Sequence, residues 1–534
     1  MTFLILPANI KFVKPIINPN QTMKKIFLIA LSMLGMTAYA QNPQVKTANG
    51  TLEGVKEASG IVSYKGVPFA QPPVGDLRWK EPQAPKNWTG VRKADHFGPQ
   101  AMQRYIYSDM QFRSDGKSED CLYLNVWAPP RAKGSKLPVL VYFYGGGFQA
   151  GDGSEYRYDG EALAKKGIIT VTVNYRLGIF GFMAHPELTA ESPHHASGNY
   201  GLMDQHAALV WVQKNIAAFG GDASKVTIGG ESAGSMSVCG QVASPLSKGL
   251  FRAAIGESGS LLGNLSPTPR ADAEEYGVKF ATSIGARSLA DLRKIPADTL
   301  LKWSARGHFG TDVDGYFLPE TPQAIFAAGK QMDVSLLAGW NSAESGPNGI
   351  LGRSEPTVDN YKAGIERLYK DRAQDILGAY PAATDADVTQ AATNLASDRF
   401  IAYATWKFID MQSKTGHKPV YRYFFNKRRP IMANAPAGAV EHSPGAAHAS
   451  EIEYALGNLP TNKVYAWTPD DFKTSETLQN FFVNFVKTGN PNGNGLPLWD
   501  TVKGSKFMVI NQDSRQQPIA DAKRYAVMDS FFNK

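Results

Sequence analysis

The sequence predicts an α/β protein with a large, mostly parallel sheet covered by helices on both faces. Apolar runs with the length and the β-branched or aromatic content of buried strands recur along the chain, and longer helical patterns separate them. The chain has 534 residues, 43% hydrophobic and 11% aromatic, so it can bury a large core. This length is compatible with one enlarged α/β domain or with several small domains.

The clearest candidate strands follow one another in a regular alternation with helices. They are residues 138–143, 168–175, 226–228, 334–338 and 420–425. Between the second and the third, apolar residues recur at helical spacing over residues 204–219, and Gly220 and Gly221 end the pattern. A strand, a helix and another strand in succession form a βαβ unit, which predicts a parallel sheet.

Residues 23–40 are typical of a secretory leader, whereas the 22 residues before Met23 fit no targeting pattern. Met23, Lys24 and Lys25 precede the apolar run 26–36, and Ala38 and Ala40 then supply small residues two positions apart. This pattern predicts translation from Met23 and a secretory signal peptide cleaved after Ala40, with residues 41–534 as one catalytic-type domain in a secreted or periplasmic protein. The apolar run is far shorter than the roughly 20 residues that span a bilayer, so no stable membrane insertion is expected. No cysteine follows it, which excludes a lipoprotein.

Charge and cysteine content exclude several functional classes. The formal net charge of +8 includes four lysines of the first forty residues, and the remaining excess is too mild and dispersed to predict nucleic-acid binding. Cys121 and Cys239 can form at most one disulfide, and neither has a cysteine close by that would complete a metal site. We expect no metal or organic cofactor, and the sequence does not indicate an oligomeric state.

A candidate nucleophile lies at Ser232, in the GxSxG segment Gly230–Gly234. A strand precedes this segment and a helical pattern begins at Ser235, so the serine would sit on a sharp strand-to-helix turn. There the N-terminus of the helix favours developing negative charge. The alternative is a glycine-rich turn with an idle serine, because so short a motif also occurs by chance. The flanking strand and helix favour the nucleophile.

A serine hydroxyl needs a base, and the base needs an orienting acid. On this kind of sheet the order along the chain is serine, acid, histidine. Glu344 follows the candidate strand 334–338, and His442 and His448 both lie in the loop after the last clear strand. His206 falls inside a helical pattern and is interpreted as structural.

The glycines Gly145–Gly147 follow the strand 138–143 and can turn backbone N–H groups toward a substrate carbonyl as an oxyanion hole. A phosphate-binding loop is the alternative, but the Lys-Ser/Thr pair and the GxGxxG spacing are absent.

These features belong to a longer series of motifs. The series comprises YKGVPFAQPPVG (64–75), EDCLYLN (119–125), YGGGF (144–148), NYRLGIFGF (174–182), GNYGLMDQ (198–205), FGGD (219–222), GESAG (230–234), FRAAIGESGS (251–260) and TGNPN (488–492). Together they make the chain resemble the type B carboxylesterases of the carboxylesterase and cholinesterase family, as a secreted bacterial member, from about residue 50 to about residue 499. The resemblance implies the α/β-hydrolase fold, with helical cap insertions, and hydrolysis of small-molecule carboxylic esters through an acyl-enzyme.

The resemblance also implies a role for particular residues. Ser232 matches the nucleophile, Glu344 the acid and His448 the base, so that His448 replaces His442 as the candidate. The backbone N–H groups of Gly146, Gly147 and Ala233 match the oxyanion hole. Ser258 matches a serine that supports the acid and the base, and Glu231 matches a glutamate that lines the pocket.

The sequence departs from the family pattern near these residues. Ala101 takes the place of a cysteine that often pairs with the one in EDCLYLN, so Cys121 is expected to be a free, buried thiol. The segment 101–119 has no tryptophan, which makes choline esters a poor candidate substrate. Ala449 and Ser345 replace glycines that usually flank the histidine and the acid.

Other functions remain compatible with the same residues. An amidase, peptidase or thioesterase would use the same triad, whereas a non-catalytic binding protein of this fold typically lacks the nucleophile. The lining of the pocket is not predicted in detail. Phe148, Trp211, Trp340 and the helical region 267–301 could line or cover it, although buried aromatic residues more often serve packing.

Overall fold

The computed structural model describes residues 42–130, 134–436, 438–439 and 443–532. The predicted leader with its cleavage site, and His442, lie outside these residues. Residues 44 to 534 form one compact unit.

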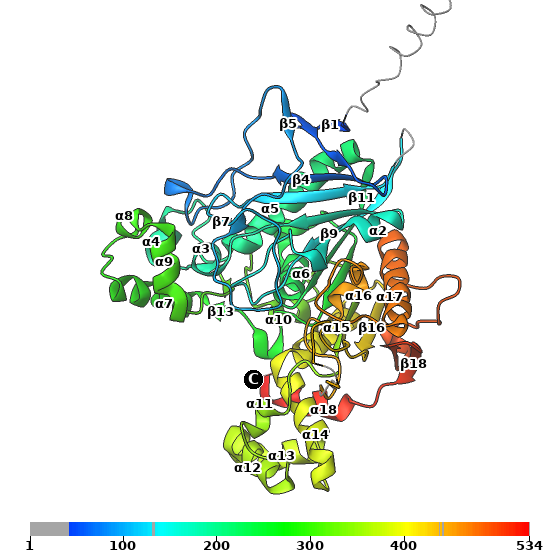
Figure 1. Ribbon diagram of the computed structural model, residues 1–534. Coiled ribbons are helices and arrows are strands. Elements are labelled where there is room, and N and C mark those ends of the chain that lie inside the picture. The colour runs from blue at the N-terminus through cyan, green and yellow to red at the C-terminus, as the bar shows by residue number, and fades with distance from the viewer. Residues whose placement is uncertain (1–41, 131–133, 437, 440–442, 533–534) are drawn as a thin grey trace, which may run out of the picture. The chain divides into compact units, whose positions relative to one another are not determined.

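An eleven-stranded mixed sheet forms the centre of this unit, in the order β18-β17-β16-β15-β12-β11-β9-β10-β8-β4-β3 (Figure 1). Its strands are β3 (Val55–Lys56), β4 (Val62–Pro68), β8 (Tyr123–Ala128), β9 (Leu137–Phe143), β10 (Ile169–Val173), β11 (Gly221–Glu231), β12 (Ala253–Glu257), β15 (Ser335–Asn341), β16 (Val420–Phe425), β17 (Lys506–Ile510) and β18 (Arg515–Pro518). The seven strands from β10 to β17 in this order are parallel, and antiparallel strands flank them at both edges. The predicted α/β class is confirmed, and all the predicted strands belong to the parallel block.

Three small sheets lie outside the central one. They are formed by β1 (Gln44–Lys46), β2 (Thr51–Glu53) and β5 (Val91–Lys93), by β6 (Gln100–Ala101) and β7 (Lys117–Ser118), and by β13 (Thr268–Pro269) and β14 (Asp312–Val313).

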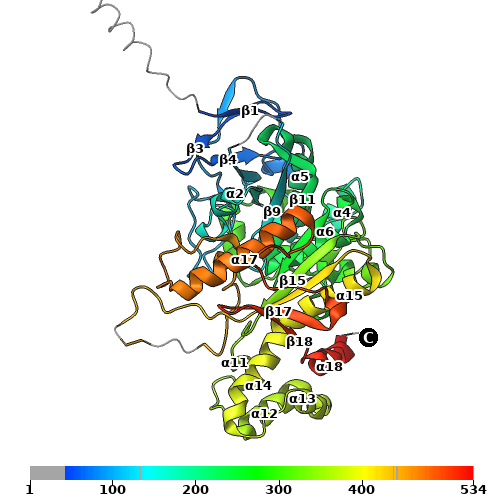
Figure 2. The ribbon, with the colours of Figure 1, turned by 90° about the vertical axis from the view of Figure 1, so that its right-hand side faces the viewer.

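Helices cover both faces of the sheet (Figures 1 and 2). The α-helices are α2 (Glu161–Lys165), α3 (Gly178–Phe182), α4 (Pro186–Glu191), α5 (Tyr200–Asn215), α6 (Ala233–Ala243), α7 (Arg270–Ser283), α8 (Leu289–Lys294), α9 (Ala297–Trp303), α10 (Pro322–Ala327), α11 (Asn348–Leu351), α12 (Val358–Tyr369), α13 (Ala373–Ala379), α14 (Asp385–Ser397), α15 (Tyr403–Thr415), α16 (Ile452–Leu456), α17 (Pro469–Thr488) and α18 (Ala522–Phe532). Helices α2 and α17 pack on one face, and α5, α6 and α15 pack on the other. The predicted helix 204–219 is α5 with the short 3-10 turn η3 (Ile216–Phe219), and Gly220 ends it with φ +89°.

The apolar core follows this layering. Strands β9 and β10 are buried along almost their whole length, as expected for central parallel strands covered on both faces. A second apolar cluster lies among the helices α11 to α14, which form a lobe at the foot of both views, and α18 packs against it. Cys121 and Cys239 are free and buried, which confirms the expectation for Cys121. No described helix is both long enough and apolar enough to cross a membrane.

Candidate active site

Ser232 occupies the turn between β11 and α6. Its backbone has φ +56° and ψ −121°, a conformation that residues other than glycine rarely adopt. Glycine at position 234 allows the turn to be tight, because a Cβ atom on Gly234 would lie 2.0 Å from the carbonyl oxygen of Phe143. The Ser232 N–H donates to the Glu257 carbonyl at 2.8 Å, which fixes the turn against β12. The sequence therefore folds here into a strained turn that presents a serine at the carboxyl end of the sheet.

His448 connects this serine to a carboxylate. Its Nε2 lies 2.9 Å from Ser232 Oγ, and its Nδ1 lies 2.6 Å from Glu344 Oε2. A carboxylate at Nδ1 favours the tautomer with a proton on that nitrogen, which leaves Nε2 free to accept the serine proton. This chain of contacts can activate the hydroxyl as a nucleophile.

The backbone brings the acid and the histidine together although they are far apart in sequence. Glu344 follows β15. The residue just before Glu344 pairs with the segment just before His448. Ala343 and Ala447 form a parallel bridge, and the Ala343 N–H donates to the Ala446 carbonyl at 2.8 Å. The two loops therefore keep their separation without help from a substrate.

Neighbouring polar groups orient the acid. Ser258 Oγ donates to Glu344 Oε1 at 2.6 Å, and the Asn341 N–H donates to the same oxygen at 2.6 Å. Asn341 also donates through Nδ2 to Glu451 Oε2 at 2.5 Å. With one oxygen held by these donors, Glu344 presents the other to His448. Ser258 thus lies behind the acid, beyond the cavity.

The histidine lies among buried carboxyl groups. Glu231 Oε1 is 3.3 Å from His448 Nε2, at ion-pair distance. Burial raises the pKa of Glu231 to about 8, although the charge of His448 acts in the opposite direction. Burial alone would lower the pKa of His448, but the charges of Glu231 and Glu344 outweigh it and raise that pKa to about 9. His448 and Glu231 therefore compete for a proton next to the nucleophile.

Further carboxyl groups lie behind this pair. Burial and the charge of Glu344 raise the pKa of Glu451 to about 7. Burial and the charge of Glu451 raise the pKa of Glu257 well above its usual range, and Tyr142 OH donates to Glu257 Oε1 at 2.8 Å. These shifts favour a protonated Glu257 at neutral pH, whereas the pKa of Glu451, about 7, lies close to neutral pH.

A cavity of about 600 Å³ opens at Ser232. Gly146 and Gly147 line it, and Gly146 has φ +107°, with space for no side chain because a Cβ atom would lie 2.2 Å from the Ala150 carbonyl oxygen. Ala233 is the first residue of α6. The predicted oxyanion-hole residues thus lie on the glycine loop beside the nucleophile and at the start of the helix that follows it.

Other predicted residues lie elsewhere. Of the aromatic candidates, Phe148 lines the cavity, whereas Trp211 and Trp340 line separate pockets. The helices α7 to α9 contribute no lining residue, although the loops on either side of them do. His206 lies in α5 with Nδ1 3.1 Å from Ser247 Oγ.

Several residues of the site have no motif of their own. Asn341 contacts Glu344 and Glu451 contacts Ser258, and Phe400 places its ring 5.0 Å from that of His448, centroid to centroid. Asp109 and Arg157 line the cavity. Asn341 ends the observed strand β15, three residues beyond the predicted strand 334–338, so a polar residue close to a predicted strand was the available signal.

Comparison with known proteins extends these observations to the whole chain. The profile of the carboxylesterase family matches residues 41–528. The chain belongs to the carboxylesterase family. Its large mixed sheet with helices on both faces is accordingly the α/β-hydrolase fold, and the chain is a carboxylic ester hydrolase.

Characterised members align along most of this carboxylesterase. A fumonisin B1 esterase of Sphingopyxis macrogoltabida is 34% identical over 493 residues, which cover 89% of this chain and 87% of that protein. A para-nitrobenzyl esterase of Bacillus subtilis is 34% identical over 508 residues, with 90% and 95% covered. A medium-chain fatty acyl-CoA hydrolase precursor of Anas platyrhynchos is 33% identical over 531 residues, with 90% and 91% covered.

Proposed function

We propose that this carboxylesterase cleaves small-molecule esters by acyl transfer to Ser232, with His448 as the base and Glu344 as the acid that orients it. The observation that carries the proposal is the continuous contact from Ser232 Oγ to His448 Nε2 at 2.9 Å and from His448 Nδ1 to Glu344 Oε2 at 2.6 Å. This geometry supplies both requirements of a serine nucleophile, a base in reach and an acid that fixes the tautomer of that base.

In the first step, His448 takes the hydroxyl proton while Ser232 Oγ attacks the ester carbonyl. The negative charge that develops on the carbonyl oxygen would be received by the N–H groups of Gly146, Gly147 and Ala233. His448 then gives its proton to the leaving alcohol, and an acyl-serine remains. Water repeats the sequence, with His448 again as the base, and releases the carboxylic acid.

Replacement of the nucleophile tests this proposal. Ser232→Ala is expected to lower kcat for p-nitrophenyl butyrate at least about a thousandfold, because the remaining groups only bind and polarise the ester. Ser237→Ala is the matched control: Ser237 lies in the following helix and its hydroxyl donates to the Ala233 carbonyl at 2.8 Å. A Ser232→Ala protein that turns over ester at the wild-type rate would overturn the proposal.

The leaving group needs a separate comparison. Matched p-nitrophenyl esters, nitroanilides and thioesters of one acyl chain distinguish an esterase from an amidase or thioesterase that uses the same residues. We expect kcat/KM to be highest for the ester. No turnover of any of the three by the wild type would favour a binding protein of the same fold.

We further propose that the protein is exported and that its mature form begins at Gln41, since an apolar run behind two lysines precedes small residues at the expected cleavage site. Mass spectrometry of protein recovered outside the cytoplasm tests this. A first residue other than Gln41 would contradict the cleavage site.

A further inference from the structure

The substrate cavity contains a buried guanidinium group. Arg157 belongs to the short 3-10 turn η2 (Tyr156–Tyr158) and lines the same cavity as Ser232, with its side chain 5% exposed. In the described part of the chain it is the one lysine or arginine that lines this cavity. A positive charge in so buried a position requires an anionic partner.

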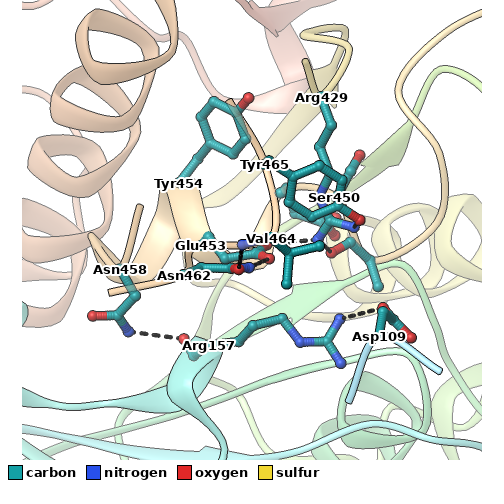
Figure 3. Close-up of polar contacts among 12 residues, drawn as sticks. Asp109, Arg157, Arg429, Ser450, Glu453, Tyr454, Asn458, Asn462, Val464 and Tyr465 are labelled. Atoms are coloured by element: carbon teal, nitrogen blue, oxygen red, sulfur yellow. Dashed lines mark hydrogen bonds and ion pairs between the residues drawn. The ribbon is translucent and has the colours of Figure 1, made fainter. Parts of the chain in front are cut away.

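The backbone holds Arg157 in place (Figure 3). Asn458 Nδ2 donates to the Arg157 carbonyl at 2.8 Å and to the Asp159 carbonyl at 2.9 Å. On its side chain, Nε donates to Glu155 Oε1 at 2.6 Å, and Glu155 is itself only 1% exposed. One edge of the guanidinium is therefore fixed within the protein.

The other edge has a different kind of partner. Arg157 Nη1 donates to Asp109 Oδ2 at 3.1 Å, and the Asp109 side chain is 42% exposed (Figure 3). Asp109 also lines the cavity, on a segment where Tyr105 is 74% and Tyr107 44% exposed. A partly solvated carboxylate thus pairs with a buried arginine at the lining of the cavity that a substrate would enter.

We propose that Arg157 is a specificity residue that binds a free carboxylate of the substrate, and that Asp109 holds this position until the substrate displaces it. The substrates would be esters that carry a carboxylate on their acyl or alcohol chain. The guanidinium presents parallel N–H donors that match a carboxylate, so it both attracts and orients such a chain. This inference rests on the proposed function, because it assigns the substrate class of the same site.

Paired substrates that differ in one charge test the proposal. For the acyl side, p-nitrophenyl hydrogen adipate is compared with p-nitrophenyl hexanoate, and for the alcohol side carboxypentyl acetate with hexyl acetate. The measured quantity is the ratio of kcat/KM for the acidic ester to that for the neutral one. In the wild type we expect a ratio above unity on at least one side, carried mainly by KM.

Three variants locate the effect. Arg157→Gln is expected to lower this ratio about tenfold or more, the usual cost of losing a hydrogen bond between charged groups. Asp109→Asn is expected to raise the ratio of acidic to neutral kcat/KM severalfold, because the Asp109 carboxylate no longer competes with the substrate for Arg157. Arg104→Gln is the control: Arg104 is exposed on the same segment and its Nη2 donates to the Ala305 carbonyl at 2.9 Å, so the variant removes one positive charge and this hydrogen bond near the cavity but leaves Arg157 in place.

The outcomes separate this inference from the triad. A wild-type ratio below unity on both sides, or a ratio that Arg104→Gln lowers as much as Arg157→Gln does, overturns it. If Arg157→Gln does not fold, Asp109→Asn decides, and an unchanged or lowered ratio overturns the proposal. Loss of turnover of both the acidic and the neutral ester in Ser232→Ala tests the triad alone. It does not affect the ratio of kcat/KM values measured with the other variants.

Discussion

Glu231 controls the protonation of His448 through its charge. The two groups lie 3.3 Å apart, and the charge of Glu231 contributes to the raised pKa of the histidine, about 9. In the proposed mechanism only neutral His448 accepts the Ser232 proton, so activity should rise with pH as the imidazolium loses its proton.

Glu231→Gln is therefore expected to shift the acid limb of the pH profile to lower pH. Removal of a nearby negative charge lowers the pKa of His448, and the neutral base then exists at lower pH, by about 1 pH unit. The measurement is kcat/KM for p-nitrophenyl butyrate against pH, with circular dichroism to verify folding. An acid limb that stays in place, or moves to higher pH, would show that Glu231 carries no charge when His448 titrates.

Ser258→Ala is expected to weaken catalysis without abolishing it. The variant removes the 2.6 Å hydrogen bond to Glu344 Oε1, but the Asn341 N–H still donates to that oxygen. We expect kcat to fall about ten- to a hundredfold with little change in KM, since the loss of a hydrogen bond to a charged group costs about 1.5–3 kcal/mol. Ser258→Thr retains the hydroxyl and should restore part of kcat. A larger effect on KM than on kcat would contradict a positioning role.

The sequence could indicate these residues only in part. Ser232 was predicted from a short motif and Glu344 from a strand end, whereas the order along the chain left both His442 and His448 open and the family resemblance selected His448. The structure brings them within contact distance, while their roles remain proposals. Glu451 lies 193 residues from Ser258, which donates to it, and no local pattern encodes a contact of that separation.

At the scale of elements, the turn from β11 to α6 depends on close backbone contact. Gly234 lies against Phe143 and Tyr144, so β9 and the glycine loop fix the position of Ser232 from the other side. This packing explains why the turn tolerates the unfavourable backbone conformation of Ser232.

Gly234→Ala is accordingly expected to lower the free energy of unfolding by about 1–3 kcal/mol, as overpacking of a tight site does. The matched control is Gly378→Ala, in helix α13, where an added Cβ atom meets nothing within 4 Å. The control should be neutral or more stable by up to about 1 kcal/mol, because alanine favours a helix. Urea unfolding measures both, and equal effects of the two substitutions would contradict the packing argument.

Most of the central parallel strands were predicted, whereas β12 and β17 of the parallel block and the antiparallel strands at the edges were not. The predicted strands are mostly apolar, because parallel strands covered on both faces bury nearly all their side chains. In β8 the polar Asn125 interrupts the apolar residues. In the structure Asn125 is buried, donates to Thr172 Oγ1 at 2.9 Å and accepts from the Gly66 N–H at 3.0 Å, and these long-range contacts are invisible in the sequence.

At the scale of the whole molecule, the C-terminal helix α18 is tied to the middle of the chain. Arg524 Nε and Nη2 donate to Asp398 Oδ2 at 2.9 and 2.6 Å, and Tyr380 OH donates to the same oxygen at 2.7 Å. Asp398 is fully buried, so its charge depends on this arginine.

Arg524→Gln is expected to lower the free energy of unfolding by about 3 kcal/mol or more, because it leaves a buried carboxylate without its partner. Lys330→Gln is the control, since the side chains of Lys330 and its ion-pair partner Glu320 are 61% and 47% exposed, and it should change stability by less than about 0.5 kcal/mol. Urea unfolding at neutral pH compares the two. Equal stability of the variants would mean that α18 is held by apolar packing alone.

The two free thiols can be used to measure local opening of the structure. Cys121 precedes β8 and Cys239 lies in α6, both are buried, and burial raises the pKa of Cys239 to about 12. A thiol-reactive dye can label either residue only after the surrounding structure separates. Labelling of these native cysteines would therefore measure how fast the segment before β8 and the helix α6 become exposed, and no cysteine needs to be introduced. Different labelling rates for the two cysteines would show that the structure opens in steps. One shared rate would show a single cooperative opening.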